Sequence, residues 1–431
     1  MIENRQFQQL RVVVVGQGYV GLPLAVRAAE VGHKVVGFDV DAQRVKRLVL
    51  GESYVEDIPH ARLAPLLSTG AYRPTLDSSD CADFDVAIVT VPTPLRDGVP
   101  DLSHVEDAAR ILGRHLGRGA TVVLESTTYP GTTEEVFGPV LERASGLTAG
   151  HDFHIGYSPE RIDPGNSTWK LENTPKVISG IDPASKEAVR RFYGSLVDTV
   201  VPVASCKEAE LTKLLENTFR HVNIALANEL AIFAHELDID VWSAINAAST
   251  KPFGFMRFAP GPGVGGHCLP IDPSYLSWRV QRTLGRNFRF VELANDVNNH
   301  MPDYVVRRLV EGLNERRKSL NGSRILLLGL AYKANTGDAR ETPAARIAEL
   351  LTDMGAEVQA ADPHVTDDAH PRAAGLENLQ RVEVTPDGLA AADAVVLLAE
   401  HDAFDYPLIS AHAPYILDCR HRLAGAHVES L

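Results

Sequence analysis

Cysteine and long apolar runs are both scarce in this sequence. Its four cysteines, among 431 residues, form no CxxC pair and no Cys/His pair with zinc spacing, so we expect no bound metal. No run reaches the ~18 apolar residues of a membrane helix. The N-terminal MIENRQFQQLRVVVVGQG also lacks the basic segment, apolar core and cleavage site of a signal peptide. We therefore expect reduced thiols, a cytoplasmic location and no membrane partner.

Positive charge is scarce as well. The chain has 42 Lys and Arg against 56 Asp and Glu, which gives a formal net charge of -14. Because nucleic-acid backbones are bound by clustered Lys and Arg, no nucleic-acid partner is expected. Core-forming residues are plentiful, since 45% hydrophobic and 23% charged residues are typical of globular proteins. The length favours two or three domains.

The N-terminal region carries alternating strand and helix signals. RVVVVGQGYVGLPLAVRAAEVGHKVVGFDVD opens with a valine run that suits a buried parallel strand, and helical periodicity follows from Gly21, with Pro23 tolerated in the first turn. HKVVGFDV, DVAIVTVP and ATVVLEST supply further strands, spaced widely enough for crossover helices. These signals predict a doubly wound sheet over roughly the first 200 residues.

A long helix and a second α/β region follow. Residues 208–237 contain neither Gly nor Pro, which predicts a helix long enough to bridge two domains or form a dimer surface. A Pro/Gly-rich loop is expected at 252–273. Beyond it, NGSRILLLGLAYKANTGDAR, AEVQAADPHV, DAVVLLAE and PYILDCR predict a smaller sheet without the full glycine fingerprint. The expected fold is α/β, with two Rossmann-like doubly wound domains joined by a long central helix and boundaries at 1–207, 208–318 and 319–431.

The first turn predicts a dinucleotide site. Gly16, Gly18 and Gly21 form G-x-G-x-x-G between a strand and a helix, which allows a tight turn, close approach of a pyrophosphate and close helix packing. Asp39 ends the second strand, where a carboxylate can accept hydrogen bonds from ribose hydroxyls and repel a 2′-phosphate. The sequence therefore predicts NAD rather than NADP, with Arg44 leaving a small opening for the phosphorylated cofactor.

Cys268 lies in GPGVGGHCLPIDP, with no second cysteine nearby. An isolated cysteine is more often an inert buried residue. In an NAD enzyme, however, a thiolate can add to an aldehyde, give up a hydride from the thiohemiacetal and become a thioester that water hydrolyses. The flanking glycines would remove bulk near the sulfur and offer backbone N–H groups, while Pro270 and Pro273 restrict the loop.

Five separated blocks resemble the UDP-glucose/GDP-mannose dehydrogenase family, whose members use NAD to oxidise the C6 alcohol of nucleotide sugars. The resemblance covers nearly the whole chain, and the blocks occur in the family's order. They are ESTTYPGTT at 125–133, YSPERIDPG at 157–165, LTKLLENTFRHVNIALANEL at 211–230, GGHCLPID around Cys268, and GLAYKANTGDARETPA at 329–344.

The resemblance implies roles for the residues of these blocks. Cys268 would be the nucleophile, with flanking glycines that leave space for the sugar C6. Lys213 would be the cation that stabilises oxyanions and moves protons. Asn217 lies one turn after Lys213, on the same helical face. Asp272 would orient the lysine or an attacking water. The full catalytic set implied is Cys268, Lys213, Asn217, Asp272, Glu160 (thioester hydrolysis) and Thr127 (beside the nicotinamide and a water).

The resemblance also implies two sets of binding residues and a UDP-sugar-binding role for 319–431. Lys333 and Arg340 would reach the substrate and cofactor and offset a diphosphate. If the sugar carries an acetamido group at C2, Arg161, Arg220 and His221 could bind it. The expected cofactor contacts are Gly16, Gly18, Tyr19, Val20, Gly21, Asp39, Arg44, Thr93, Thr127 and Arg340. The expected substrate contacts are Arg161, Lys213, Asn217, Arg220, His221, Gly265, Lys333 and Arg420.

The expected activity is a four-electron oxidation of a UDP-N-acetyl-hexosamine. The wording around the cysteine is most similar to the UDP-N-acetylglucosamine 6-dehydrogenase branch, while the N-acetylmannosamine, N-acetylgalactosamine and glucose nucleotides stay open. Two further alternatives are a two-electron hydroxy-acid dehydrogenase of the 6-phosphogluconate type, which uses no cysteine, and a non-catalytic NAD-binding protein. We also expect a homodimer or higher homo-oligomer, and a product that feeds surface polysaccharides or glycosylated metabolites.

Overall fold

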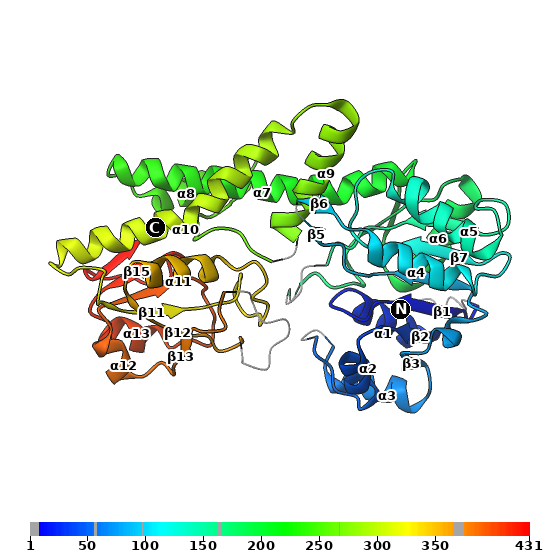
Figure 1. Cartoon of the computed structure of the whole chain (residues 1–431), viewed down its shortest axis with the longest axis horizontal. Helices are drawn as coiled ribbons and strands as arrows, with labels where there is room; N and C mark the ends of the chain where they lie inside the picture. Colours follow the sequence, from blue (N-terminus) through cyan, green and yellow to red (C-terminus); the bar gives the residue numbers. More distant parts are fainter. Residues whose placement is uncertain are drawn as a thin grey trace. The chain divides into compact units, whose positions relative to one another are not determined.

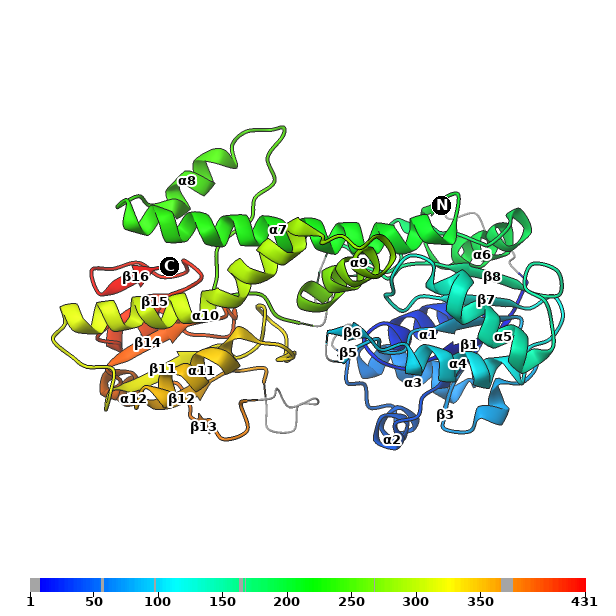
Figure 2. The same ribbon diagram turned by 45° about the horizontal axis from the view of Figure 1, so that its top comes forward.

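The chain divides into two compact units, Met1–Glu216 and Asn217–Leu431. Figures 1 and 2 show an α/β sheet with flanking helices in each of them. The two units are described separately below. The computed structural model describes residues 8–55, 58–96, 98–162, 166, 168–266, 268–365 and 375–431, without the side chains of Cys268 and Pro270.

The first unit is built on a six-stranded parallel sheet with the order β3-β2-β1-β4-β7-β8 (Figure 1). Numbered along the chain, this is 3-2-1-4-5-6, the order of a dinucleotide-binding Rossmann sheet, and its topological switch point lies between β1 and β4. The strands are β1 (Arg11–Val15), β2 (Lys34–Phe38), β3 (Tyr72–Thr75), β4 (Val86–Val89), β7 (Thr121–Leu124) and β8 (His154–Tyr157).

Valine burial explains why β1 is central. Val12, Val13 and Val14 are fully buried, because helices cover both faces of a parallel sheet. Val12 and Val14 belong to a core cluster with residues of α1 and α6. The helices of this unit are α1 (Gly21–Glu30), α2 (Ala42–Val49), α3 (His60–Ser68), α4 (Ser103–Gly113), α5 (Gly138–Ser145) and α6 (Pro183–Leu196). The smaller elements are η1 (Ser78–Cys81), the π-helical η2 (Thr133–Phe137), and the strand pairs β5 (Leu95–Arg96) with β6 (Val99–Pro100) and β9 (Lys176–Ile178) with β10 (Val200–Pro202).

The long helix expected at 208–237 is confirmed as α7 (Cys206–Glu236), which continues from the first unit into the second. The loop expected at 252–273 is too long, because α9 (Cys268–Leu284) begins at Cys268. Pro270 lies in its first turn, where backbone N–H groups have no helical acceptor, so the missing N–H costs little. The other helices of this region are α8 (Val241–Ala248) and α10 (Arg289–Glu315).

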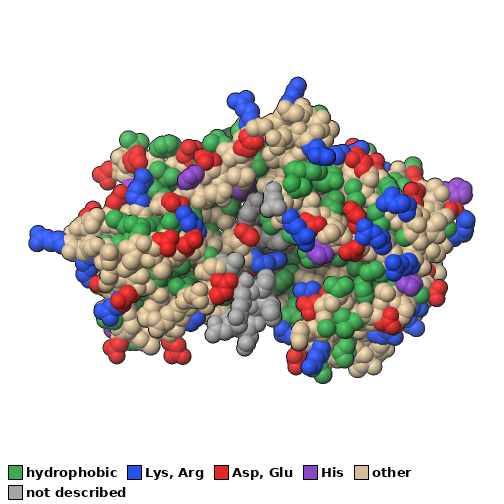
Figure 3. All heavy atoms as spheres, in the orientation of Figure 1, with side chains coloured by type: hydrophobic (Ala, Val, Ile, Leu, Met, Phe, Trp, Pro, Cys, Tyr) green, Lys and Arg blue, Asp and Glu red, His purple; other side chains and the backbone are tan. Residues whose placement is uncertain are grey.

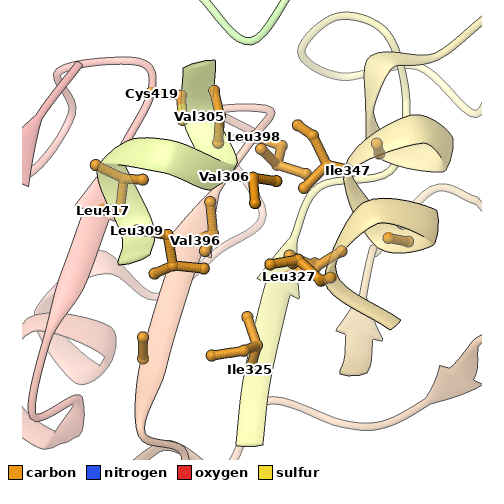
Figure 4. Packing of buried hydrophobic residues seen from close by; sticks show 14 of the residues in the cluster. Val305, Val306, Leu309, Ile325, Leu327, Ile347, Val396, Leu398, Leu417 and Cys419 are labelled. Carbon is orange, nitrogen blue, oxygen red and sulfur yellow. The ribbon is translucent and has the colours of Figure 1, made fainter. Parts of the chain in front are cut away.

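The second unit repeats the same strand order around a second parallel sheet, β13-β12-β11-β14-β15-β16. Side chains of β11 alternate between its faces: Ile325 and Leu327 pack with α10 and α11, and Leu326 and Leu328 pack with α12 and α13. Figure 4 shows the first of these clusters. The elements are β11 (Arg324–Leu328), α11 (Pro343–Asp353), β12 (Glu357–Ala361), β13 (Gln380–Arg381), α12 (Pro386–Ala391), β14 (Ala394–Leu397), α13 (Tyr406–His412), β15 (Ile416–Asp418) and β16 (Val428–Ser430).

The expected fold class, two doubly wound domains with a long central helix, is therefore confirmed, although four strands of the two six-stranded sheets and the short pairs β5–β6 and β9–β10 were missed. The four missed strands of the large sheets, β3, β8, β13 and β16, lie at sheet edges and lack the valine-rich run of β1. The three domain boundaries stay a prediction.

Among the described residues no helix is long and apolar enough to span a membrane. On the face seen in Figure 3, acidic and basic side chains are interspersed.

Candidate active site

The turn between β1 and α1 has the geometry expected of a pyrophosphate site. Gly16 has a φ of +89°, and a Cβ there would lie 2.8 Å from the carbonyl oxygen of Thr90. A Cβ at Gly21 would lie 1.8 Å from the carbonyl oxygen of Gly16. A Cβ at Gly18, in contrast, would meet no described atom within 4 Å. The fold itself thus requires glycine at 16 and 21, and at 18 the approach of a ligand is the remaining reason for it.

The N-terminus of α1 is open to an anion. No side chain caps it, and its first turn carries no acidic residue. Tyr19 and Val20, two of the expected cofactor contacts, are half-exposed in the turn that leads into it. Because helix N-terminal N–H groups and the helix dipole both favour negative charge, this end suits a diphosphate. The turn fits the expected dinucleotide.

Asp39 lies directly after β2 and is 4% exposed. Its carboxylate accepts hydrogen bonds from the backbone N–H groups of Gln17 (2.7 Å) and Asp41 (2.9 Å). Arg44 donates to it at 2.9 Å, and the Arg44 guanidinium lies 5.7 Å from the centre of the Tyr54 ring. The two residues that sequence analysis singled out for cofactor selection are thus one ion pair beside the glycine turn.

Thr93 and Thr127 follow β4 and β7, at the carboxyl edge of the first sheet. The Thr93 hydroxyl is buried and donates to the carbonyl oxygen of Thr127 at 2.8 Å. The loops after two neighbouring strands are therefore tied together. Ligands of open α/β sheets bind at this edge.

Glu160 follows β8 at the same edge and is 8% exposed. One of its oxygens accepts a short hydrogen bond from the Ile162 N–H, and the other lies 3.7 Å from Nζ of Lys176. Lys176 is 2.7 Å from Glu125, whose Oε1 also accepts a hydrogen bond from Tyr193. Sequence analysis missed Glu125, Lys176 and Tyr193. Only Glu125 had a signal, its place directly after a buried strand.

The first part of α7 carries a second buried acid that sequence analysis missed. Glu210 accepts hydrogen bonds from the Gly131 N–H (2.6 Å) and from the N–H and hydroxyl of Thr133 (2.8 and 2.7 Å). Burial raises the pKa of Glu210 to about 7, although these hydrogen bonds act in the opposite direction. Lys213, one helical turn later, is 8% exposed. Glu210 thus ties the segment after Thr127 to the helix of Lys213.

Arg161, expected at the sugar, has partners within its own unit. Its guanidinium donates to the carbonyl oxygen of Pro175 at 2.6 Å and pairs with Glu216 of α7 at 2.7 Å. It joins the loop after β8 to α7.

In the second unit, Asn217 and Asp272 are joined directly. The Asn217 amide donates to Oδ2 of Asp272 at 2.6 Å, and the two residues are 3% and 1% exposed. Asp272 lies on α9, one turn after Cys268, whose side chain is outside the described set. The contact links α7 to the first turn of the cysteine's helix.

His221 is 1% exposed, and both of its ring nitrogens face α10. Nε2 lies 2.8 Å from the Asn295 oxygen, and Nδ1 lies 3.3 Å from the Asn298 amide nitrogen, which fits a neutral ring. Burial lowers its pKa. Arg220 is exposed. The described contacts of His221 are therefore made to α10.

The glycines before Cys268 have a packing reason that the sequence did not show. A Cβ at Gly265 would lie 2.7 Å from both the Glu341 carbonyl oxygen and the Tyr332 Cβ. The Gly266 N–H donates to the carbonyl oxygen of Arg340 at 2.9 Å. The loop was expected to be glycine-rich to leave space for a sugar, yet the second unit's own Tyr332–Glu341 segment already demands small residues here.

Besides Arg220, three expected basic residues of the second unit lie along this segment and nearby. The Lys333 ammonium lies 5.8 Å from the centre of the Tyr332 ring, and Arg340 is paired with Asp338 at 2.6 Å. Arg420 donates to the carbonyl oxygen of Leu398 at 2.7 Å and lies 3.2 Å from Glu400. A Cβ at Gly261 would lie 2.7 Å from the Arg420 guanidinium.

The other cysteines are unsuited to nucleophilic chemistry. Cys81, Cys206 and Cys419 are free and fully buried. Burial raises the pKa of Cys81 to about 11 and those of Cys206 and Cys419 to about 12. Because the thiolate is the nucleophile, these thiols are inert near neutral pH. Figure 4 places Cys419 among the apolar side chains of its core cluster.

The structure therefore groups the expected residues within each unit. The first unit holds the glycine turn, Asp39–Arg44 and the loop residues Thr93, Thr127 and Glu160. The second holds Asn217–Asp272 and the glycine loop against the segment that carries Lys333 and Arg340.

Three consecutive segments of the chain match the models of three domains of one protein family. They are the UDP-glucose/GDP-mannose dehydrogenase NAD binding domain at 10–197, the central domain at 207–300 and the UDP binding domain at 326–424.

Similar proteins agree with these matches. The chain is 38% identical over 404 residues to a UDP-N-acetyl-D-glucosamine 6-dehydrogenase of Pseudomonas aeruginosa, covering 92% of each. It is 36% identical over 396 residues to a UDP-N-acetyl-D-mannosamine dehydrogenase of Pyrococcus horikoshii, covering 92% of this chain and 90% of that one. A solved structure of the UDP-D-ManNAc dehydrogenase of Pyrococcus horikoshii matches with a TM-score of 0.88 and 33% identity, over 98% of this chain and 99% of that one.

Proposed function

Because this chain belongs to the UDP-glucose/GDP-mannose dehydrogenase family, we propose that it oxidises the C6 alcohol of a UDP-N-acetyl-hexosamine to a carboxylate, with NAD as the cofactor. Both the family and the cofactor agree with the expectation from the sequence. NAD, when bound, accepts the hydride that leaves C6 in each of two oxidations. The glycine turn would hold its diphosphate, and Asp39 its ribose hydroxyls.

We assign the covalent steps to Cys268. After the first oxidation its thiolate forms a C–S bond to the C6 aldehyde, giving a thiohemiacetal that the second oxidation converts to a thioester. Water then attacks C6 and breaks the C–S bond, which releases the carboxylate, the thiolate and two protons. Over the whole reaction, the alcohol and one water lose two hydrides and three protons.

Polar residues around C6 would supply the other roles. Lys213 would stabilise the oxyanions formed at C6 and carry protons, and Glu160 would assist the attack of water on the thioester. The observation that carries this proposal is the buried Asn217–Asp272 hydrogen bond of 2.6 Å. It supports a preorganised polar pair one turn from Cys268, where a buried amide and carboxylate cost free energy unless they are satisfied or used.

For the sugar we propose UDP-N-acetylglucosamine, oxidised to the N-acetylglucosaminuronic acid. The similar protein of Pseudomonas aeruginosa bears that name, while the Pyrococcus horikoshii protein is named for N-acetylmannosamine. Their nearly equal identity to this chain keeps the C2 epimer as the second candidate. Arg220, exposed on α7, is our candidate for discrimination at the acetamido group.

A panel of UDP-sugars tests the proposal. Purified protein, NAD and each of UDP-N-acetylglucosamine, UDP-N-acetylmannosamine, UDP-N-acetylgalactosamine and UDP-glucose are mixed, and NADH is followed by absorbance. We expect UDP-N-acetylglucosamine to react fastest and to give two NADH per sugar consumed. One NADH per sugar would favour a two-electron enzyme, and no NADH with any sugar would favour a non-catalytic NAD-binding protein.

Replacement of the cysteine tests the covalent steps. Cys268→Ser should lower the formation of uronic acid by roughly 1000-fold, because a neutral hydroxyl is a far weaker nucleophile than a thiolate. Cys81→Ala, at a buried thiol of the first unit, is the matched control and should remain active. Full turnover to the uronic acid by Cys268→Ser would show that no cysteine adduct is needed.

We further propose a homodimer formed through α7. Phe219, Leu226, Leu230 and Phe233 recur at helical spacing and are 45–54% exposed, an apolar stripe that a second copy would cover. The free thiols support a reducing, cytoplasmic setting.

A further inference from the structure

Lys176, at the start of β9, is an unusual lysine because it is 3% exposed. Among the described residues its ammonium has acceptors on three sides. These are Oε1 of Glu125 at 2.7 Å, the carbonyl oxygen of Pro159 at 3.1 Å and Oε2 of Glu160 at 3.7 Å. The first two are within hydrogen-bond distance of the ammonium, and Glu160 faces it as a charged neighbour.

The cluster of Glu125, Lys176 and Glu160 has two carboxyl groups for one ammonium, and Oε2 of each carboxyl group is buried without a hydrogen-bond partner among the described residues. Burial raises the pKa of Glu125. Burial alone would lower the pKa of Lys176, but the charges of Glu125 and Glu160 outweigh it and raise that pKa, so the lysine stays charged. Well-packed apolar residues often replace such buried ions without loss of stability, so stability is a weak reason for this arrangement.

The same lysine fixes the loop that carries Glu160. It donates to the carbonyl oxygen of Pro159, directly before Glu160, as well as facing the Glu160 carboxylate. The Ser158 hydroxyl adds a hydrogen bond of 2.7 Å to the carbonyl oxygen of Val177, the next residue of β9. Both the backbone and the charged group of the Glu160 loop are thus held by β9.

We propose that Lys176 is a positioning residue for the hydrolytic half of the reaction, holding Glu160 in the orientation that directs water onto the thioester. Glu125, held in turn by Tyr193, anchors the lysine from the other side. This inference rests on the proposed function. In this inference β9 contributes to the last step, the hydrolysis of the thioester, and has no role in binding the nucleotide sugar.

Lys176→Met tests the inference, because methionine keeps much of the volume and removes the charge. We expect kcat to fall roughly 10- to 100-fold with KM for the UDP-sugar little changed, since assistance by a positioned acid or base contributes on this order. Rapid mixing with NAD and the fastest UDP-sugar should give a burst of NADH. Intact-protein mass spectrometry after acid quenching should show the acyl adduct, which builds up when hydrolysis is slowest. Lys176→Arg, which keeps a cation, should show less adduct and faster turnover than Lys176→Met.

The controls distinguish three outcomes: a variant that does not fold, a proposed function that is wrong, and a role of Lys176 that is wrong. If Lys176→Met does not fold, Lys176→Met/Glu125→Gln removes both members of the short ion pair, and the same burst and adduct are expected. Lys186→Met, at a lysine of α6 that donates to the Val203 carbonyl oxygen, should behave as the wild type. An absence of NADH in the wild-type reaction would overturn the proposed function and this inference together. A wild type that turns over, beside folded Lys176 variants with no burst and no adduct, would overturn this inference alone.

Discussion

Two aspartates at equivalent places, directly after the second strand of each sheet, have different side-chain partners. Asp39 follows β2, and Asp362 follows β12 in the second sheet. Asp362 accepts hydrogen bonds from the N–H groups of Leu330 (2.6 Å) and His364 (2.8 Å), and buried His401 lies 3.0 Å from it. Burial would raise the pKa of Asp362, but the hydrogen bond and charge of His401 hold it well below its usual range. Asp39 also accepts backbone N–H groups, but its side-chain partner Arg44 is partly exposed, whereas His401 beside Asp362 is fully buried.

Glu210 gives a prediction about stability and pH. Its pKa is raised to about 7 by burial, whereas an unfolded glutamate titrates near 4.3, so the folded chain holds the proton more tightly. Between these values the unfolded state is the one that has lost the proton, so stability falls as pH rises. Relative to Glu210→Gln, the free energy of unfolding of the wild type should fall by about 3 kcal/mol from about pH 4.5 to 7.5.

Urea unfolding of both proteins across this range measures the difference. Glu208→Gln, at an exposed glutamate of the same helix, is the control and should show no such trend. A constant difference between the wild type and Glu210→Gln would contradict the raised pKa.

The β1–α1 turn illustrates how an element can serve the fold and a ligand with different residues. Gly16 and Gly21 are fixed by contacts within the chain, while the Cβ position of Gly18 is open. The helix that follows has no side-chain cap. In this turn, contacts within the protein require glycine at positions 16 and 21, whereas none of the described atoms requires it at position 18.

Gly18→Ala and Gly21→Ala should therefore behave differently. Gly18→Ala should keep its thermal midpoint within a few degrees and raise the Kd for NAD by at least about tenfold, or 1.4 kcal/mol. Gly21→Ala should fail to fold or lose several kcal/mol, because its Cβ would overlap the Gly16 carbonyl oxygen. Calorimetry measures both the midpoints and NAD binding. Unchanged NAD affinity in Gly18→Ala would contradict a pyrophosphate at this turn.

The exposed apolar stripe of α7 carries the prediction of a dimer. Leu230→Glu would place a charge in the proposed interface and should raise the dimer dissociation constant by about 100-fold or more, since it loses an apolar contact and buries a carboxylate. Sedimentation velocity over a concentration series measures the change. Gln281→Glu, which adds the same charge at an exposed position of α9, should leave the dimer intact. A monomeric wild type would contradict the proposal.

At the scale of the whole molecule, the chain combines two sheets of the same strand order. The matched NAD binding domain lies in the first unit and the UDP binding domain in the second. On the face seen in Figure 3, charges of both signs are interspersed, so the proposed anionic ligands would be met by local features, such as a helix N-terminus and single basic side chains.

The two ligands should therefore act through separate residues. NAD or UDP at 100 times its Kd should each stabilise the wild type by about 2.7 kcal/mol. Asp39→Ala should lose the stabilisation by NAD and keep that by UDP, and Lys333→Ala should show the reverse. Thermal shifts, each measured against the same variant without ligand, test this. Loss of both effects in either variant would argue against the division.

Much of this protein could be predicted from local sequence. The valine run of β1, the uninterrupted helical spacing of α7 and the glycines at 16, 18 and 21 act through neighbouring residues, so their structure follows from their order in the chain. The edge strands β3 and β8 were missed because their sequences, YRPT and HIGY, carry no β-rich run. Pairing with a neighbouring strand makes them strands.

The sequence alone determined the Rossmann-like architecture, the NAD fingerprint and the family, because these depend on residue type and spacing. Tertiary structure decided which polar groups meet. Lys176 lies between Glu125 and Glu160, and Glu210 caps the Gly131–Thr133 turn from 77 residues or more away along the chain. It also gave the glycines before Cys268 a packing partner in the Tyr332–Glu341 segment. Such contacts depend on distances in space between residues far apart in sequence, and no local pattern encodes them.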